Sequence, residues 1–68
     1  METKSGIIKA IISKGRYGFI LQEDGSDIFF HKAGVLKPEF EELREGMSVE
    51  FFVAINPKGT RAIGVVAV

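Results

Sequence analysis

Two short segments with alternating side chains, residues 16–20 and residues 27–31, constrain the fold more than any other feature of the chain. An Asp-Gly pair at residues 24–25 lies between them and suits the tight turn of a β-hairpin. Because successive strand side chains point to opposite faces, the hairpin has two distinct faces. One face holds Gly18, Ile20, Ile28 and Phe30, and the other holds Tyr17, Phe19, Phe29 and His31. A sheet this small has one core to fill, so we predict that the first set faces the core and the second faces solvent.

The solvent-facing set predicts an exposed aromatic patch on the outside of the hairpin. Such a patch costs solubility, and on a small domain it usually marks a binding surface. Flat rings next to a histidine suit the stacking of unpaired nucleic-acid bases, which present a planar face whatever their identity. The structural alternative places Tyr17 and Phe19 in the core and turns Gly18 and Ile20 outward.

Three further segments have the character of strands. They are residues 6–13, residues 47–55 and residues 61–68. The first is rich in β-branched side chains, and the second alternates so that Val49, Phe51 and Val53 would face the core. Asn, Pro and Gly at residues 56–59 favour a tight turn before the last segment. We therefore predict an all-β fold, a five-stranded antiparallel Greek-key barrel of the OB-fold type, with an SH3-like barrel as the alternative.

The connection over residues 32–46 is too long for a simple hairpin loop. Pro38 suits the first turn of a short helix that would extend to Leu43, with Phe40 and Leu43 on one side. The same connection carries a cluster of glutamates, which we expect to be solvated.

The chain has 68 residues, enough for one domain over residues 1–68. It contains no cysteine and a single histidine, so neither a disulfide nor the common zinc clusters are expected. The amino terminus lacks the apolar run of a signal peptide, and no stretch approaches the roughly 20 apolar residues of a membrane span. We expect a soluble, cytoplasmic protein with no cofactor, no metal and no membrane partner.

Catalytic chemistry has little support in the sequence. Ser26, Asp27 and His31 are the residue types of a hydrolase triad, but the Gly-x-Ser-x-Gly context of the nucleophile is absent. A phosphate-binding glycine loop is absent as well. We expect a binding protein rather than an enzyme.

Charge is balanced over the whole chain but unevenly distributed along it. The formal net charge is +0, whereas residues 1–22 carry +3 and residues 23–50 carry −5. The neutral total does not favour a protein held by phosphate attraction alone. The local excess places basic side chains near the predicted aromatic patch.

Both hairpin segments resemble the ribonucleoprotein motifs of the cold-shock domain family, the single-stranded nucleic-acid-binding OB-folds typified by bacterial cold-shock proteins. The family's first motif, Lys-Gly-Phe/Tyr-Gly-Phe-Ile, is similar to Tyr-Gly-Phe-Ile at residues 17–20. Its second motif, Val-Phe-Val-His, is similar to Ile-Phe-Phe-His at residues 28–31. Residues 40–46 are similar to the family's long loop with its base-contacting Phe, and the resemblance covers residues 6–65.

Three positions depart from the family pattern. Ala10 occupies the place of a stacking Trp in the first strand, and Lys32 replaces an aromatic residue that often follows the histidine. Arg16 stands directly before Tyr17, either in place of the family's Gly or through a shift in loop length. Since each stacked base contributes about 1–3 kcal/mol, the two missing rings would weaken binding unless the basic side chains compensate.

The resemblance, together with the two faces of the hairpin, implies a set of interface residues. They are Lys9, Arg16, Tyr17, Phe19, Phe29, His31, Lys32 and Phe40. The rings of the hairpin would stack on bases, and His31 would stack or donate a hydrogen bond. Phe40 would close one end of the surface, and Lys9, Arg16 and Lys32 would lie near the phosphates.

The partner that we expect is single-stranded RNA or DNA, bound with modest sequence preference because every base has a planar face. A protein that holds strands apart would act as an RNA chaperone or as a regulator of transcription or translation. We expect a monomer or a weak homodimer. The alternative is a protein-interaction OB module whose aromatic face or last strand docks onto a partner.

Overall fold

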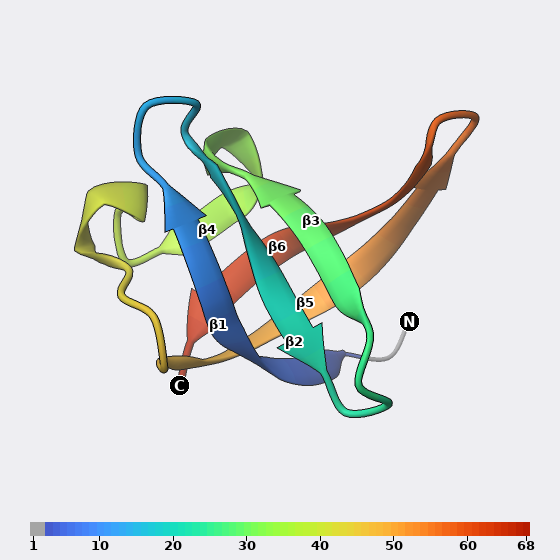
Figure 1. Cartoon of the computed structure of the whole chain (residues 1–68), viewed down its shortest axis with the longest axis horizontal. Coiled ribbons are helices and arrows are strands. Elements are labelled where there is room, and N and C mark those ends of the chain that lie inside the picture. The colour runs from blue at the N-terminus through green and yellow to red at the C-terminus, as the bar shows by residue number, and fades with distance from the viewer. Residues whose placement is uncertain (1–2) are drawn as a thin grey trace.

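The computed structural model describes residues 3–68, and its strands form one sheet that closes on itself. The strands are β1 (Lys4–Ile12), β2 (Tyr17–Gln22), β3 (Asp27–His31), β4 (Val35–Lys37), β5 (Ser48–Asn56) and β6 (Gly59–Ala67) (Figure 1). Two 3-10 turns, η1 (Lys32–Gly34) and η2 (Phe40–Glu42), lie in the long connection. The all-β prediction is therefore confirmed, and all five predicted strands are present. No helix within the described residues is long and apolar enough to cross a membrane.

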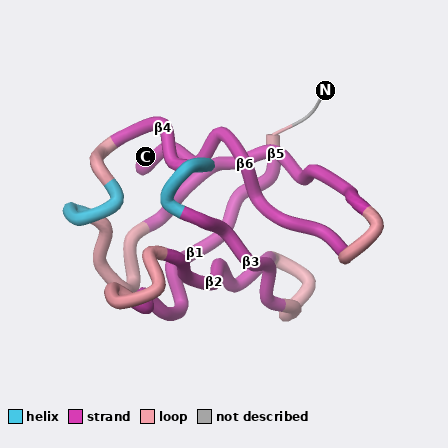
Figure 2. Tube along the Cα trace, turned by 90° about the horizontal axis from the view of Figure 1, so that it is seen from above, coloured by secondary structure: helices cyan, strands magenta, loops and turns pink. Residues whose placement is uncertain are grey.

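The strand order is β3-β2-β1-β5-β6-β4, and an additional pairing between β3 and β6 closes the barrel. Figure 2 shows β1, β2 and β3 on one side of the molecule and β4, β5 and β6 on the other. The structure adds two details to the predicted five-stranded barrel. The three-residue β4 is a sixth strand, and both β4 and β3 pair with β6 in parallel. Sequence patterns do not predict these short pairings, because each of them joins distant segments over only two residue pairs.

The core lies between these two sides and confirms the predicted faces of the hairpin. Ile20 and Phe30 are 0% exposed and Ile28 is 3% exposed. Gly18 is buried beside Phe30, and a Cβ at this glycine would stand 2.8 Å from the Phe30 ring and 2.5 Å from the Ala10 carbonyl oxygen. Glycine is required at this position because a larger residue would push the phenylalanine out of the core.

The predicted core side of the fourth segment is also confirmed. Val49 and Phe51 are fully buried, and Val53 packs against the core cluster. The predicted helix at residues 38–43 reduces to the single turn η2, with Phe40 and Leu43 both buried on its inner side. One 3-10 turn suffices because both side chains anchor the connection to the barrel.

Turn chemistry agrees with the sequence at the β2–β3 and β5–β6 hairpins. Gly25 adopts a φ of 90° between β2 and β3, where a side chain would strain the backbone. In the β5–β6 hairpin, the Asn56 side-chain oxygen accepts a hydrogen bond of 2.9 Å from the Lys58 N–H, and Gly59 adopts a φ of 129°. Figure 1 shows this hairpin projecting beyond the rest of the barrel.

Candidate nucleic-acid interface

Three aromatic rings form a cluster on the outer face of β2 and β3. Phe19 pairs directly with Phe29 across the two strands, and Tyr17 lies two pairs further along, opposite His31. Ring centroids are 5.6 Å apart for Tyr17 and Phe29, 6.0 Å for Tyr17 and Phe19, and 6.1 Å for Phe19 and Phe29. All three side chains are half-buried, since each ring shields the edges of the others. The rings therefore face solvent as predicted, and we call them the aromatic cluster.

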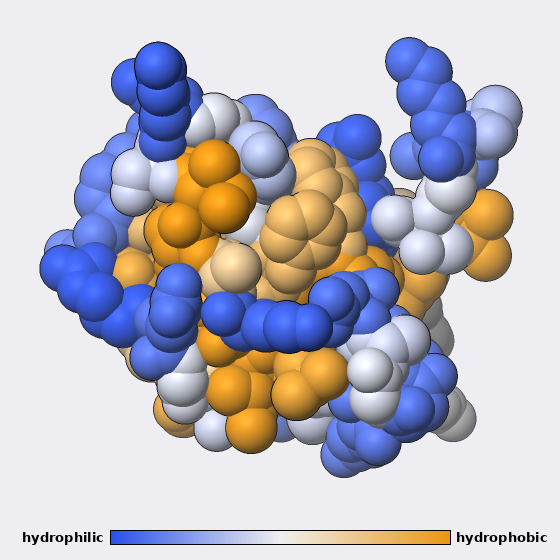
Figure 3. All heavy atoms as spheres, in the orientation of Figure 1, coloured by the Kyte–Doolittle hydropathy of each residue, from blue (hydrophilic) through white to orange (hydrophobic). Residues whose placement is uncertain are grey.

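The surface around the aromatic cluster is apolar on the β1 side. Figure 3 shows hydrophobic atoms gathered over the middle of this face, with a hydrophilic band crossing it. Ala10 pairs with Phe19, Ile12 pairs with Tyr17, and Ile7 pairs with Leu21. Ala10, at the position of the family's stacking Trp, thus borders the aromatic cluster as expected, but its side chain is aliphatic.

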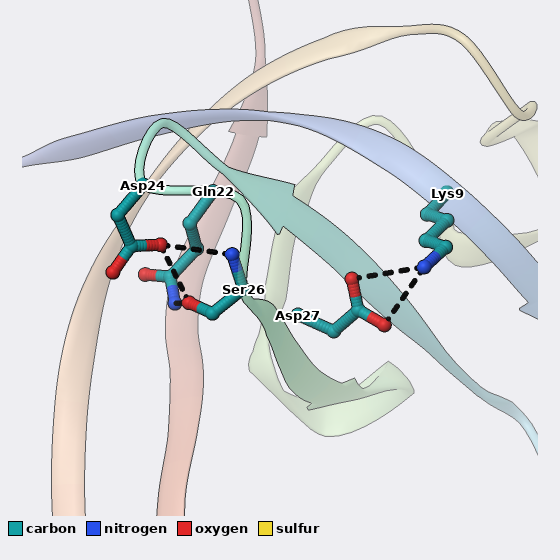
Figure 4. Close-up of polar contacts among 5 residues, drawn as sticks. All are labelled: Lys9, Gln22, Asp24, Ser26 and Asp27. Carbon is teal, nitrogen blue, oxygen red and sulfur yellow. Dashed lines mark hydrogen bonds and ion pairs between the residues drawn. The ribbon is translucent and has the colours of Figure 1, made fainter.

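Lys9 reaches across β2 to form an ion pair with Asp27, the first residue of β3 (Figure 4). Its Nζ lies 3.0 Å from Oδ2 and 3.2 Å from Oδ1 of the carboxylate. A register shift in the β1–β2 pairing between Ile8 and Ala10 accompanies this placement of Lys9. Both partners remain largely exposed, so the pair adds little stability and can exchange with another anion. The predicted phosphate contact of Lys9 therefore competes with an internal carboxylate.

The turn beside this ion pair is held by side-chain hydrogen bonds (Figure 4). Asp24 Oδ1 accepts from the hydroxyl and the backbone N–H of Ser26 at 2.6 and 2.9 Å. Gln22 Nε2 donates to the same hydroxyl at 3.0 Å. These hydrogen bonds from Ser26 lower the pKa of Asp24 below its ordinary value, so the carboxylate keeps the turn rigid at neutral pH.

Lys32 is the second cation near the cluster that is paired internally. Its Nζ donates to Glu41 Oε2 at 2.9 Å, which joins η1 to η2. The hydrogen bond from Lys32 lowers the pKa of Glu41 below its ordinary value, with a smaller contribution from the charge of Arg16. Since this pKa is depressed, the pair is intact at neutral pH and is lost only as the pH falls through that lowered value.

His31 has a structural bond in addition to its place beside Tyr17. Its Nδ1 accepts a hydrogen bond of 3.0 Å from the Ala33 N–H and thereby caps η1. When Nδ1 of an imidazole accepts a hydrogen bond, Nε2 carries the N–H that can donate. We predicted that His31 would stack on a base or donate a hydrogen bond, and the hydrogen bond can therefore be donated from Nε2.

Arg16 has a backbone conformation that glycine adopts more readily than other residues. Its φ of 58° lies in the left-handed region, and among residues 3–68 it is the one non-glycine residue with a positive φ. The turn before β2 thus contains a strained arginine. The carbonyl of Arg16 accepts a hydrogen bond of 2.9 Å from the Lys32 N–H, which holds both residues at the same end of the cluster.

The expectation for Phe40 is corrected by the structure. Its side chain is 5% exposed and belongs to the core cluster. The centroid of its ring lies 6.2 Å from that of Phe30. The connection folds back onto the barrel because the core can bury the large apolar ring of Phe40. Phe40 therefore does not close one end of the aromatic cluster in this conformation.

Arg61 joins the aromatic cluster although sequence reasoning left it out. β6 runs parallel to β3 and places Arg61 opposite Phe29, with the guanidinium carbon 5.4 Å from the ring centroid. This geometry is that of a cation–π contact. Alternation along the last strand places Arg61 on the outer face. No local sequence pattern, however, predicts the pairing of β6 with β3 that brings Arg61 to Phe29.

A closed β-barrel with an aromatic cluster on the outer face of two central strands defines the class of OB-fold domains that bind single-stranded nucleic acid. The model of the 'Cold-shock' DNA-binding domain matches residues 4–68. The chain belongs to the cold-shock domain family, which is known for binding single-stranded nucleic acids.

Individual relatives agree with this assignment over nearly the full chain. The chain is 42% identical over 69 residues to a cold shock-like protein CspJ of Salmonella typhimurium, covering 98% of this chain and 99% of that protein. It is 38% identical over 64 residues to a cold shock-like protein CspI of Escherichia coli, covering 93% and 91%. Among solved structures, the drosophila Unr CSD456 matches with a TM-score of 0.81 and 26% identity over 98% of this chain, which spans 27% of that longer chain.

Proposed function

We propose that the outer face of β1, β2 and β3 binds single-stranded RNA or DNA by stacking unpaired bases on Tyr17, Phe19 and Phe29. The observation that carries the proposal is the cluster itself, in which three rings 5.6–6.1 Å apart lie half-exposed on neighbouring strands. Stacking on such rings contributes about 1–3 kcal/mol per base and tolerates any base. The proposal therefore includes weak sequence preference and no covalent chemistry.

Polar groups around the cluster supply orientation and charge. His31 donates from Nε2 to a base or sugar, since its Nδ1 is engaged by Ala33. Lys9, Arg16 and Lys32 meet the phosphates after Lys9 and Lys32 exchange their carboxylate partners for the nucleic acid. Because those internal carboxylates offset part of the positive charge, affinity depends less steeply on salt than three unpaired cations would require.

A protein that binds the open state of a hairpin shifts the equilibrium away from base pairing. This provides the physical basis for an RNA chaperone or for a regulator of transcription or translation.

The proposal is tested by titrating a labelled oligothymidylate of about seven nucleotides, within the site sizes of OB-folds, and following fluorescence anisotropy at two salt concentrations. Tyr17 is the single tyrosine and the chain has no Trp, so quenching of intrinsic fluorescence reports directly on the cluster. We expect Phe19→Ala and Phe29→Ala each to weaken binding by about 1–3 kcal/mol. No binding by the wild type even at low salt would refute the proposal.

A second candidate function is docking of a protein partner on the same side of the barrel. Ile7, Leu21 and Val68 are exposed apolar side chains that line a groove where β1, β2 and the carboxyl end meet. The internally paired lysines also leave this face less basic than nucleic-acid binding would favour. Leu21→Ser separates the two functions. It should weaken docking of a protein partner, because it removes apolar area from the groove, and it should leave oligonucleotide binding unchanged, because the three rings stay in place.

A further inference from the structure

The aromatic cluster is asymmetric across the barrel. On the β1 side, Phe19 is followed by Ala10, and Tyr17 by Ile12, so planar groups end at β2. On the other side, Phe29 is followed across the β3–β6 pairing by Arg61, whose guanidinium is also planar. The row of planar groups therefore continues from the aromatic cluster to Arg61 on β6.

The cations around the aromatic cluster also differ in their partners. Within residues 3–68, the two side-chain ion pairs are those of Lys9 with Asp27 and of Lys32 with Glu41. Arg61 is exposed and takes part in neither of them. Its charge at the edge of the cluster is thus offset by no carboxylate within ion-pair distance in the described part of the chain.

We propose that Arg61 is a nucleotide-binding residue that directs the bound strand from Tyr17 over Phe29 to β6. This inference rests on the nucleic-acid binding proposed above and adds the course of the strand and the residue that sets it. One base stacks on the guanidinium, which Phe29 supports from the other side. The adjacent phosphate is attracted by the same charge. Arg61 thereby compensates for the stacking position that Ala10 leaves empty on β1.

An arginine can perform both tasks, whereas a lysine can perform one of them. The guanidinium is planar, delocalised and weakly hydrated, so it stacks between a ring and a base. The ammonium of a lysine carries the same charge on a compact, strongly hydrated group. A comparison of Arg61→Lys with Arg61→Ala therefore separates stacking from charge.

The experiment measures anisotropy of the labelled oligothymidylate with the wild type, Arg61→Ala, Arg61→Lys and Phe29→Ala. Lys58→Ala is the matched control, because it removes one positive charge from the same hairpin away from the aromatic cluster. We expect Arg61→Ala to weaken binding about tenfold or more, as for one lost stacked base. Arg61→Lys should recover only part of this loss, and Lys58→Ala should stay within about twofold of the wild type, as for one exposed charge.

A double-mutant cycle tests whether Arg61 and Phe29 act together. If the guanidinium depends on the Phe29 ring for its position, the double variant loses less affinity than the sum of the two single losses. Far-UV circular dichroism melts of every variant check the fold, and Arg61→Gln provides a planar, uncharged replacement that is expected to bind better than Arg61→Ala.

Each remaining result identifies which claim fails. Loss of binding in Phe29→Ala with an Arg61→Ala affinity equal to that of Lys58→Ala would overturn the role of Arg61 and leave the aromatic cluster as the binding site. Full recovery by Arg61→Lys would reduce Arg61 to a point charge and refute the stacking. A wild type that does not bind the oligonucleotide would remove the proposed function and this inference together.

Discussion

Truncation of Phe51 tests the division of the barrel into a core face and a binding face. Phe51 is 0% exposed, and a buried Phe ring removes about 150–250 Å² from water. At about 25 cal/mol per Å² this area corresponds to roughly 4–6 kcal/mol, close to the 3–5 kcal/mol typical of Phe→Ala in protein cores. A domain of this size has a free energy of unfolding of about 3–10 kcal/mol. Phe51→Ala is therefore expected to remove most of the stability.

The matched comparisons are Phe52→Ala and Phe19→Ala. Phe52 is the next residue in β5 and is half-buried on the outer side, and Phe19 is half-buried in the aromatic cluster. Each should lose about 1 kcal/mol, since the ring already contacts water. Urea denaturation followed by far-UV circular dichroism gives all three values with the same slope. Equal losses for Phe51→Ala and Phe19→Ala, or a loss below about 1 kcal/mol for Phe51→Ala, would refute the assignment of the two faces.

Three other substitutions test single features of the interface. Asp27→Asn should release Lys9 and tighten oligonucleotide binding at low salt, with a steeper dependence of affinity on salt by up to about 0.7 in slope; an unchanged slope would show that Lys9 meets no phosphate. Ala10→Trp should place a ring beside Phe19 and tighten binding by about 1–3 kcal/mol in the anisotropy titration, and unchanged affinity would exclude β1 from the path of the strand. Arg16→Gly should raise the unfolding free energy by up to about 1 kcal/mol, because glycine adopts a φ of 58° without strain; a loss of stability in urea would instead show that the arginine side chain stabilises the turn.

The internal ion pairs offset the positive charges of Lys9 and Lys32. The interface is therefore less basic than the charge of the amino-terminal segment alone indicates. Lys9 and Lys32 are held by Asp27 and Glu41, which come from the acidic middle of the sequence. A nucleic acid must displace these carboxylates before it gains the full attraction of either lysine. The stacking groups therefore carry more of the proposed affinity here than phosphate contacts do.

The sequence by itself determined the faces of the central hairpin. Alternation along residues 17–20 and 28–31 places the rings outside and the small or aliphatic side chains inside, because the side-chain period of a strand is two wherever the strand lies. The turn residues of the β2–β3 and β5–β6 hairpins are also local consequences of the residues present. The barrel and the aromatic cluster could thus be predicted without coordinates.

Only the tertiary structure decided which distant groups meet on that surface. Phe40 turned inward because the core had room for its ring, and Arg61 reached Phe29 because β6 closes the barrel against β3 in parallel. Lys9 met Asp27 across an intervening strand, near a register shift in β1. Each of these contacts depends on the register between segments far apart in the chain, and register is set by the packing of the whole barrel rather than by any local pattern.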